Sequence, residues 1–384
     1  RSNFGGSVWS RLPDGRWYYH TFAKEQPDLN WECKELRQKI YEMINWWLEK
    51  GIAGFRIDAI TFIKKDLSFA SRPTNDGELY PVEKLTDYKG IGTVAEAPGV
   101  DDAAFERYAG KNGYFSMIFD FGWENMEGEN DKSSIHAVER WKKKMFTHVA
   151  HNSGIGWSAI FLENHDQSRC LNKFLERENI SFYSASALAS IYFFLYGTPF
   201  IYQGQEIGMT NVKWKNINDM DDIRAKRTYE EAVGQGKDPE EVLAYFSELG
   251  RDNARTPMQW DDSENGGFTC GKPWIKCNDN YRTINVQSEV NDPDSLYNYY
   301  KRLIQCYHDH ADIVRQAEFR PMYEEYPGLF AYEREVDGKG LLVIVNFTNE
   351  KLMFQKIDQK CVLCNYHETE SEWLQPYEAR IYSK

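Results

Sequence analysis

Apolar side chains recur at spacings of three and four in three segments of the chain, residues 31–50, 136–150 and 184–195. This spacing places them on one face of a helix and therefore predicts three helices. Gly51 is placed to end the first of these helices. The apolar positions of that first segment are Leu36, Ile40, Met43, Ile44 and Trp47.

Five short apolar runs predict buried strands, at residues 52–58, 92–96, 115–119, 158–162 and 198–202. Strands that alternate with helices are typical of a parallel sheet. Polar residues at the strand ends favour a (β/α) barrel, whose closed form has eight strands. The chain begins within a loop, so we expect that an N-terminal portion with about three strands is absent. An open, doubly wound sheet of five strands is the alternative.

The remaining patterns predict three regions along the chain. Residues 1–30 lack sustained periodicity and are interpreted as a loop, the end of a loop-rich domain inserted in the barrel. Residues 31–315 form the barrel part, which includes a polar inserted region at 211–287 and a helix at 296–314. Residues 316–384 predict a small antiparallel β domain. Its strands are expected at 328–334, 340–347, 352–357 and 379–382.

The charge balance argues against nucleic acid and membranes as partners. The 384 residues include 46 Lys and Arg against 59 Asp and Glu, a formal net charge of −13. A surface this acidic repels phosphate backbones and anionic lipids. The longest apolar stretch, residues 191–202, contains Gly197 and Pro199 and is shorter than the roughly 20 residues that a bilayer span needs. A hydrophobic fraction of 41% excludes an intrinsically disordered chain.

The cysteines favour a reducing compartment. Seven scattered cysteines are an odd number, which fits free thiols better than a disulfide framework. The sequence opens without a signal-peptide pattern, and we expect a cytoplasmic protein. Cys361 and Cys364 form a CxxC motif without a second pair, which we interpret as inert thiols rather than a metal or redox site.

Three predicted strands each end in a carboxylate. Asp58 follows Arg56 by two positions, so the two side chains share one face of a strand and the arginine can keep the aspartate ionised. Glu96 ends an apolar strand, where burial tends to raise the pKa of a glutamate as a general acid requires. Asp166 follows Asn164 and His165 at an unusually polar strand end. Taken singly, each carboxylate is also compatible with a structural role at the rim of a sheet, and for Glu96 alone the structural interpretation is favoured.

Together, these three strand ends resemble the conserved segments of the α-amylase superfamily, the retaining α-glucosidases of glycoside hydrolase family 13. The resemblance extends through essentially the whole chain. Three longer motifs are similar to the oligo-1,6-glucosidase branch of that family: QPDLNW at residues 26–31, YQGQEIGMTN at 202–211 and GRDNARTPMQW at 250–260.

The resemblance implies a role for each matching residue. Asp58 would be the nucleophile that forms a covalent glucosyl ester, and Glu96 the acid that protonates the leaving oxygen and then activates water. Asp166 would be the third carboxylate, which grips the sugar hydroxyls. The substrate-binding residues implied at the site, which hold the sugar or orient Asp58, are Arg56, His165, Arg251 and Arg255. The retaining mechanism needs two carboxyl groups about 5–5.5 Å apart.

The sequence departs from the family pattern in ways that concern calcium and linkage. The family's first conserved segment and its calcium-binding loop, both N-terminal, are absent; we expect no cofactor and no metal in this segment, and any calcium site in the absent portion. The 38 positions between Asp58 and Glu96 are fewer than this branch would have. Ala59 occupies the position where valine is typical of α-1,6-specific enzymes, so we expect α-1,4 links to be accepted, alone or with α-1,6 links.

The resulting hypothesis is an exo-acting α-glucosidase for maltose, isomaltose and short α-glucans, whose further partner is the absent N-terminal part of its own chain. A sucrose isomerase or transglucosylase is one alternative, and it is ranked lower because the Arg-Leu-Asp-Arg-Asp segment is missing. The other alternative is a non-catalytic amylase-like subunit. Such subunits have lost their carboxylates, whereas Asp58, Glu96 and Asp166 are present here.

Overall fold

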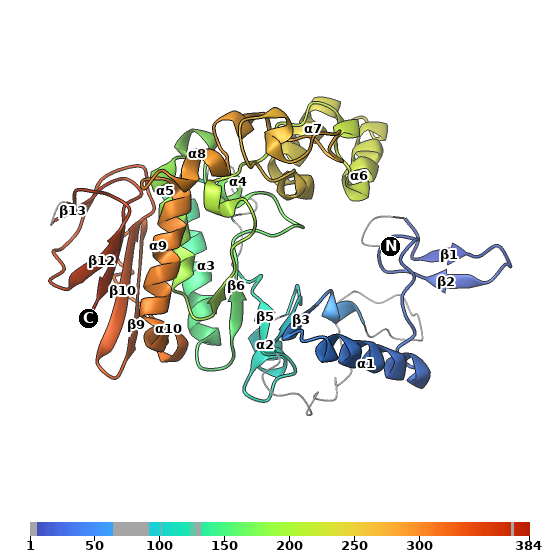
Figure 1. The fold of residues 1–384 in the computed structure, drawn as a ribbon, viewed down its shortest axis with the longest axis horizontal. Helices are drawn as coiled ribbons and strands as arrows, with labels where there is room; N and C mark the ends of the chain where they lie inside the picture. Colours follow the sequence, from blue (N-terminus) through green and yellow to red (C-terminus); the bar gives the residue numbers. More distant parts are fainter. Residues whose placement is uncertain (1–5, 64–91, 101, 124–125, 127–131, 370–371) are drawn as a thin grey trace. The chain divides into compact units, whose positions relative to one another are not determined.

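The computed structural model describes residues 6–63, 92–100, 102–123, 126, 132–369 and 372–384 (Figure 1). The chain divides into two compact units. The first comprises residues 1–121 with 155–158, and the second residues 122–154 with 159–384. Most of the segment between Asp58 and Glu96, which we predict to be shortened, lies outside the described residues.

The first unit begins with a small hairpin where a loop is predicted. Strands β1 (Trp9–Arg11) and β2 (Trp17–Tyr19) pair antiparallel. The rings of Trp9 and Tyr19 lie across the pair with centroids 5.2 Å apart. The prediction that residues 1–30 are loop throughout is therefore wrong for these strands, because a cross-strand aromatic pair stabilises strands too short to show alternation.

The rest of the first unit is a parallel sheet with its helices. Strand β4 lies between β3 and β5, with the pairs Ile57–Ala95 and Ala95–Ile118 in register. Because Ile57 and Ala95 are neighbours, the residues that follow them, Asp58 and Glu96, leave the same edge of the sheet. The elements are α1 (Lys34–Glu49), β3 (Gly54–Ile57), η1 (Ile60–Phe62), β4 (Gly92–Ala95), α2 (Asp102–Ala109) and β5 (Met117–Phe119).

The second unit contains the remaining parallel strands and most of the helices. Strand β7 pairs in parallel with β6 through Ala159–Thr198 and Ile160–Pro199. It is shorter than predicted, although the Phe200 N–H just after it still donates to the Ile160 carbonyl at 2.7 Å. The strands and α-helices are α3 (Ile135–Asn152), β6 (Ser158–Ile160), α4 (Cys170–Phe174), α5 (Phe182–Phe193), β7 (Thr198–Pro199), α6 (Ile223–Gly234), α7 (Pro239–Leu249), α8 (Val286–Val290), α9 (Leu296–Asp309) and α10 (Ala311–Gln316).

Short 3-10 helices connect these elements in the second unit. They are η2 (Arg177–Asn179), η3 (Gln205–Ile207), η4 (Ile217–Asp219), η5 (Arg251–Arg255), η6 (Glu264–Gly267) and η7 (Asp279–Arg282). Where one helix is predicted at residues 296–314, α9 and α10 are separated by His310. The His310 ring lies 2.8 Å from the Cys306 carbonyl and satisfies it, as side chains at helix C-termini do.

An antiparallel sheet at the end of the chain packs on helices of the second unit, as Figure 1 shows for α9 and α10. Its strand order is β12-β14-β10-β9-β8, and β11 pairs with β13. Tyr332 of β9 donates to the Ile191 carbonyl at 3.0 Å, within one shared hydrophobic core. The strands are β8 (Glu318–Pro321), β9 (Leu329–Val336), β10 (Lys339–Asn346), β11 (Leu352–Met353), β12 (Lys360–Cys364), β13 (Trp373–Leu374) and β14 (Ala379–Ser383).

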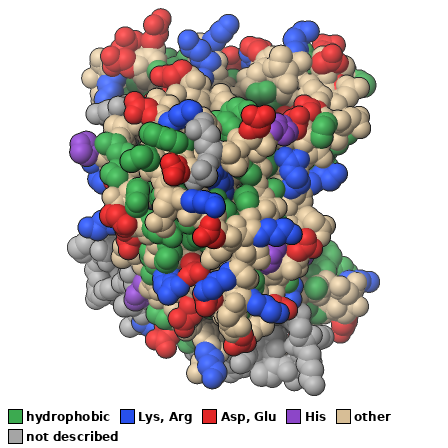
Figure 2. All heavy atoms as spheres, turned by 90° about the vertical axis from the view of Figure 1, so that its left-hand side faces the viewer, with side chains coloured by type: hydrophobic (Ala, Val, Ile, Leu, Met, Phe, Trp, Pro, Cys, Tyr) green, Lys and Arg blue, Asp and Glu red, His purple; other side chains and the backbone are tan. Residues whose placement is uncertain are grey.

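The face of the molecule drawn in Figure 2 carries side chains of both charges. Acidic and basic side chains are interspersed with hydrophobic ones there, without a continuous basic patch (Figure 2). In the described part of the chain, every helix is too short or too polar to serve as a membrane span. The predicted domain boundaries stay a prediction.

Candidate active site

Arg56, Asp58 and Glu96 form one ion-paired cluster in the first unit. Alternation along β3 puts Arg56 and Asp58 on one face, and the parallel register brings Glu96 beside them. Arg56 Nη1 donates to Asp58 Oδ1 at 2.6 Å, and Nη2 donates to Glu96 Oε2 at 2.9 Å. A single guanidinium therefore holds both carboxyl groups, as the fork geometry of arginine allows.

The two carboxyl groups differ in their exposure to water. The side chain of Asp58 is 70% exposed and that of Glu96 15%. Burial raises the pKa of Glu96, and the hydrogen bond to Asp58 raises it further. The Ala59 N–H, 3.2 Å from Glu96 Oε2, and the charge of Arg56 lower the pKa of Glu96 but do not cancel the rise. Glu96 is thus the carboxyl group that more readily keeps a proton, and it lies beside the water-exposed carboxyl group of Asp58.

Ala59 has an unusual backbone conformation. Its φ of 45° and ψ of 41° lie in the left-handed region, which is strained for residues other than glycine and most of all for β-branched ones. This turn begins η1 and aims the Ala59 N–H at Glu96. A small residue fits this position better than valine would.

Asp166 lies in a second cluster, within the second unit, together with three cationic or ionisable groups. Arg251 Nη1 donates to Asp166 Oδ1 at 3.1 Å, and Arg255 Nη2 donates to the same oxygen. His165 Nε2 is 3.4 Å from Asp166 Oδ2. Arg255 also donates to the His165 carbonyl at 2.7 Å. The four residues that the sequence predicts from two distant motifs are therefore in contact.

Asp222 belongs to this cluster although the sequence gives no signal for it. Arg251 Nη2 donates to Asp222 Oδ1 at 2.6 Å, and the Asp222 side chain is only 5% exposed. Burial lowers the pKa of Arg251, but Asp222 and Asp166 outweigh it and leave that pKa raised. Asp252 Oδ2 accepts from the Asp221 and Asp222 N–H groups at 2.7 and 2.9 Å, which fixes the loop.

A fully buried ion pair supports the strand end that carries Asp166. Glu163 and Arg169 are both 0% exposed, and Arg169 Nη1 donates to Glu163 Oε1 at 3.1 Å. Arg169 also donates to the carbonyls of Gln203 at 2.7 Å and Asn253 at 3.3 Å. The pair thus links three loops of the second unit. In the sequence, the pair is visible only as a glutamate of a buried strand six positions before an arginine. That pattern is too common to predict an ion pair.

The sequence-predicted residues fall into these two clusters. The structure brings Arg56, Asp58, Ala59 and Glu96 together in the first unit, and in the second it joins Asp166 to His165, Arg251 and Arg255. Among the described residues, no group of three or more His, Cys, Asp and Glu side chains is arranged to hold a metal ion.

Comparison with known proteins identifies the family. The family model for the catalytic domain of α-amylase matches residues 1–317. The oligo-1,6-glucosidase of Halalkalibacterium halodurans is 37% identical over 99% of this chain and 74% of its own length. A probable oligo-1,6-glucosidase of Bacillus subtilis is 39% identical with the same coverage.

A solved structure supports the same conclusion. A MutB mutant in complex with glucose matches with a TM-score of 0.90 and 32% identity, over 100% of this chain and 74% of that one. The predicted fold class, part of a (β/α) barrel followed by an antiparallel β domain, is thereby confirmed. The chain belongs to the α-amylase family, glycoside hydrolase family 13, and is a glycoside hydrolase.

Proposed function

We propose that this protein is a retaining, exo-acting α-glucosidase that releases terminal glucose from short α-linked oligosaccharides. The observation that carries the proposal is the Arg56 guanidinium bound to two carboxyl groups of unequal burial. Because one guanidinium reaches both groups, the two carboxyl groups must lie close together. This fits the carboxyl separation of about 5–5.5 Å in retaining enzymes better than the separation of about 6.5–9.5 Å in inverting enzymes.

In the first step, the Asp58 carboxylate attacks the anomeric carbon, and Glu96 gives its proton to the leaving glycosidic oxygen. The raised pKa of Glu96 suits this role, because the group must hold a proton near neutral pH. Attack forms the Asp58 ester and breaks the glycosidic bond. Arg56 orients Asp58 for the attack.

In the second step, the Glu96 carboxylate takes a proton from water while that water attacks the glucosyl ester. The carbon–oxygen bond to Asp58 breaks, glucose leaves with retained configuration, and Glu96 is protonated again. Both steps use only side chains of this chain, so the mechanism as proposed needs no cofactor.

The Asp166 cluster is proposed to hold the glucose unit. A carboxylate fixed by Arg251 and Arg255 offers acceptor oxygens to sugar hydroxyls. His165 offers a ring nitrogen beside it. Such bonds strengthen on distortion of the ring and contribute to binding of the transition state.

The proposal also specifies which glycosidic linkages the enzyme cleaves. Related proteins named oligo-1,6-glucosidase, and a glucan 1,6-α-glucosidase of Streptococcus pneumoniae at 36% identity, favour α-1,6 links. Ala59, beside Asp58, favours acceptance of α-1,4 links. We therefore propose that both isomaltose and maltose are substrates. An isomerase is not favoured, because the glucosidase relatives are up to 39% identical, whereas a mutant of the trehalulose synthase MutB of solved structure is 32% identical.

Initial rates of glucose release from maltose and isomaltose test this proposal, with the anomer of the first product followed by NMR. Release of α-glucose from either sugar supports a retaining α-glucosidase. β-Glucose in excess of the amount supplied by the reducing-end unit would refute retention. Conversion of sucrose to an isomer without net hydrolysis would favour the isomerase instead.

We further propose that the enzyme acts in the cytoplasm. All seven cysteines are free thiols, including the buried Cys170, Cys277 and Cys306. Free thiols of this kind fit a reducing compartment. Recovery of the native protein from a secreted or periplasmic fraction would contradict this.

A further inference from the structure

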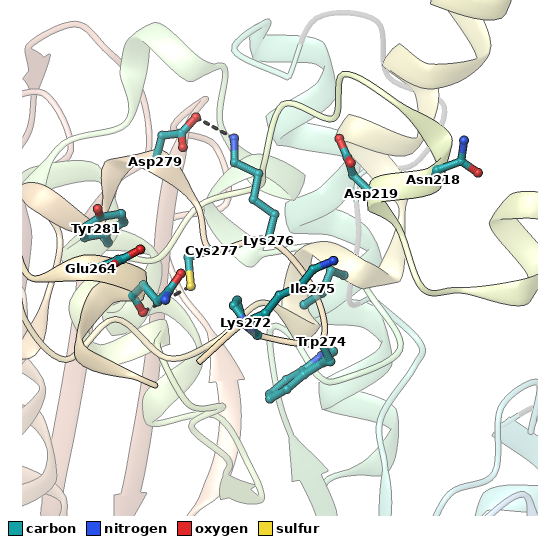
Figure 3. A pocket seen from close by; sticks show the side chains of 12 residues that line it. Asn218, Asp219, Glu264, Lys272, Trp274, Ile275, Lys276, Cys277, Asp279 and Tyr281 are labelled. Carbon is teal, nitrogen blue, oxygen red and sulfur yellow. Dashed lines mark hydrogen bonds and ion pairs between the residues drawn. The ribbon is translucent and has the colours of Figure 1, made fainter. Parts of the chain in front are cut away.

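A cavity of about 420 Å³ lies in the second unit among residues to which the proposed reaction gives no role (Figure 3). Its volume falls in the range of about 300–1,000 Å³ that is usual for small-molecule sites. It is lined by η4, by η6 and η7, and by the loop of residues 272–277. None of these residues belongs to the Asp166 cluster.

Trp274 gives this cavity a fixed aromatic wall. Its indole is 61% exposed, yet it is supported by the edge of the Phe268 ring, with centroids 5.3 Å apart. The next residue, Ile275, is 3% exposed and packs in a hydrophobic cluster with Met220 and Trp214. The loop is thus anchored directly beside the exposed ring. A large apolar face held in water in this way is typical of a binding surface.

The other lining side chains are polar and carry both charges. Asp219 and Glu264 offer acceptors, while Lys272 offers a donor. Lys276 Nζ donates to Asp279 Oδ2 at 2.7 Å (Figure 3), which balances those two charges. An aromatic face beside mixed donors and acceptors, without a dominant charge, suits a neutral, hydroxyl-rich ligand.

We propose that this cavity is an accessory binding site for a neutral oligosaccharide, in which one sugar ring stacks on Trp274 and its hydroxyls bond to Asp219 and Lys272. The choice of an α-gluco-oligosaccharide among neutral sugars rests on the proposed function. Asp219 precedes Asp222 by three residues, and Asp222 holds Arg251. The site therefore lies on the same loop that supports the residues proposed to bind the reacting glucose.

The test is an NMR titration of the full chain carrying Asp58→Asn, with maltotriose and isomaltotriose as probes and the tryptophan indole N–H signals as readout. We expect at least one of the two trisaccharides to shift the Trp274 signal. Trp274→Ala should lower the affinity for that sugar by about tenfold or more. Trp17→Ala is the matched control, because Trp17 is 62% exposed and lies in the other unit. Asp219→Ala is a second variant and should also weaken binding.

The outcomes separate this site from the proposed function. Wild-type chain and Trp274→Ala should hydrolyse a short aryl α-glucoside equally, since Trp274 has no role in the proposed reaction. Hydrolysis by the wild type with a Trp274 signal that neither sugar shifts would overturn the accessory site and leave the α-glucosidase standing. Binding unaffected by both Trp274→Ala and Asp219→Ala would overturn it as well. No hydrolysis of any α-glucoside would refute the proposed function, and Trp274-dependent binding would still support the site.

Discussion

Replacing Asp222 should separate two contributions of its carboxylate to stability, the ion pair with Arg251 and the cap of helix α6. Its Oδ1 accepts from Arg251 Nη2 at 2.6 Å and from the Arg224 N–H at 3.0 Å, where it caps α6. Asp222→Asn keeps a good helix cap and an acceptor but removes the charge. A hydrogen bond to a charged group contributes about 1.5–3 kcal/mol against about 0.5–1.5 for a neutral one. We therefore expect Asp222→Asn to lower the free energy of unfolding by about 1 kcal/mol.

Asp222→Ala should cost more, because it removes the helix cap and the ion pair together. Loss of the cap costs about 1 kcal/mol. Removing one partner of a buried ion pair costs about 3–5 kcal/mol, and this is reduced because Arg251 is 20% exposed and keeps its bond to Asp166. The total should be about 3 kcal/mol. Asp238→Ala is the matched control, since Asp238 caps α7 through the Glu240 N–H at 2.9 Å, is exposed, and should cost only about 1 kcal/mol.

Urea unfolding measures these free energies, and steady-state kinetics shows whether Asp222 positions Arg251. If it does, Asp222→Asn raises KM for maltose or isomaltose more than it lowers kcat, because Arg251 is proposed to hold the glucose unit. Equal unfolding free energies for Asp222→Ala and Asp238→Ala would refute the ion-pair reasoning. Unchanged KM in Asp222→Asn would refute the positioning role.

Four further outcomes follow from the carboxyl groups. Asp58→Asn should abolish turnover with an unchanged circular dichroism spectrum, because only an exposed attacking group is lost; near-normal activity would exclude it as the nucleophile. Glu96→Gln should slow poor leaving groups far more than activated ones, and equal losses in kcat/KM would argue against the acid role. Arg56→Met should move the basic limb of the kcat/KM profile to higher pH, since the charge of Arg56 lowers the pKa of Glu96; a shift to lower pH would contradict this. Burial raises the pKa of Glu289 to about 7, so the folded state loses stability between pH 4.5 and 7 as the unfolded chain releases its proton. Glu289→Gln should accordingly stabilise the protein by about 1–2 kcal/mol at pH 8 and not at pH 4, measured by urea unfolding.

The sequence predicts those parts of the fold that local pattern determines. Helices α1 and α3 lie within a few residues of the predicted ranges, because their apolar positions repeat every three or four residues. The pairing of Arg56 with Asp58 is likewise local, since side chains two apart on a strand share a face. Both predictions need only the geometry of a single element.

Features that depend on contacts between different elements could not be predicted from the sequence pattern of a single element. The β1–β2 hairpin depends on Trp9 meeting Tyr19 across the two strands. Asp222 meets Arg251 across 29 positions of sequence. No periodicity or motif marks such pairs, because packing between elements decides them.

The two arginine-bound clusters differ in a way that supports the roles proposed for them. In the first unit, one cation lies within 2.9 Å of both carboxyl groups, so the cation cannot by itself distinguish Asp58 from Glu96. Burial distinguishes them: Glu96 is enclosed and its pKa is raised, which supports its proposed role as proton carrier, whereas the exposed Asp58 suits the proposed role of nucleophile. In the second unit, two arginines converge on the single carboxylate of Asp166. Its partners are fixed cations rather than a second carboxyl group, which fits a residue that holds sugar hydroxyls and transfers no proton.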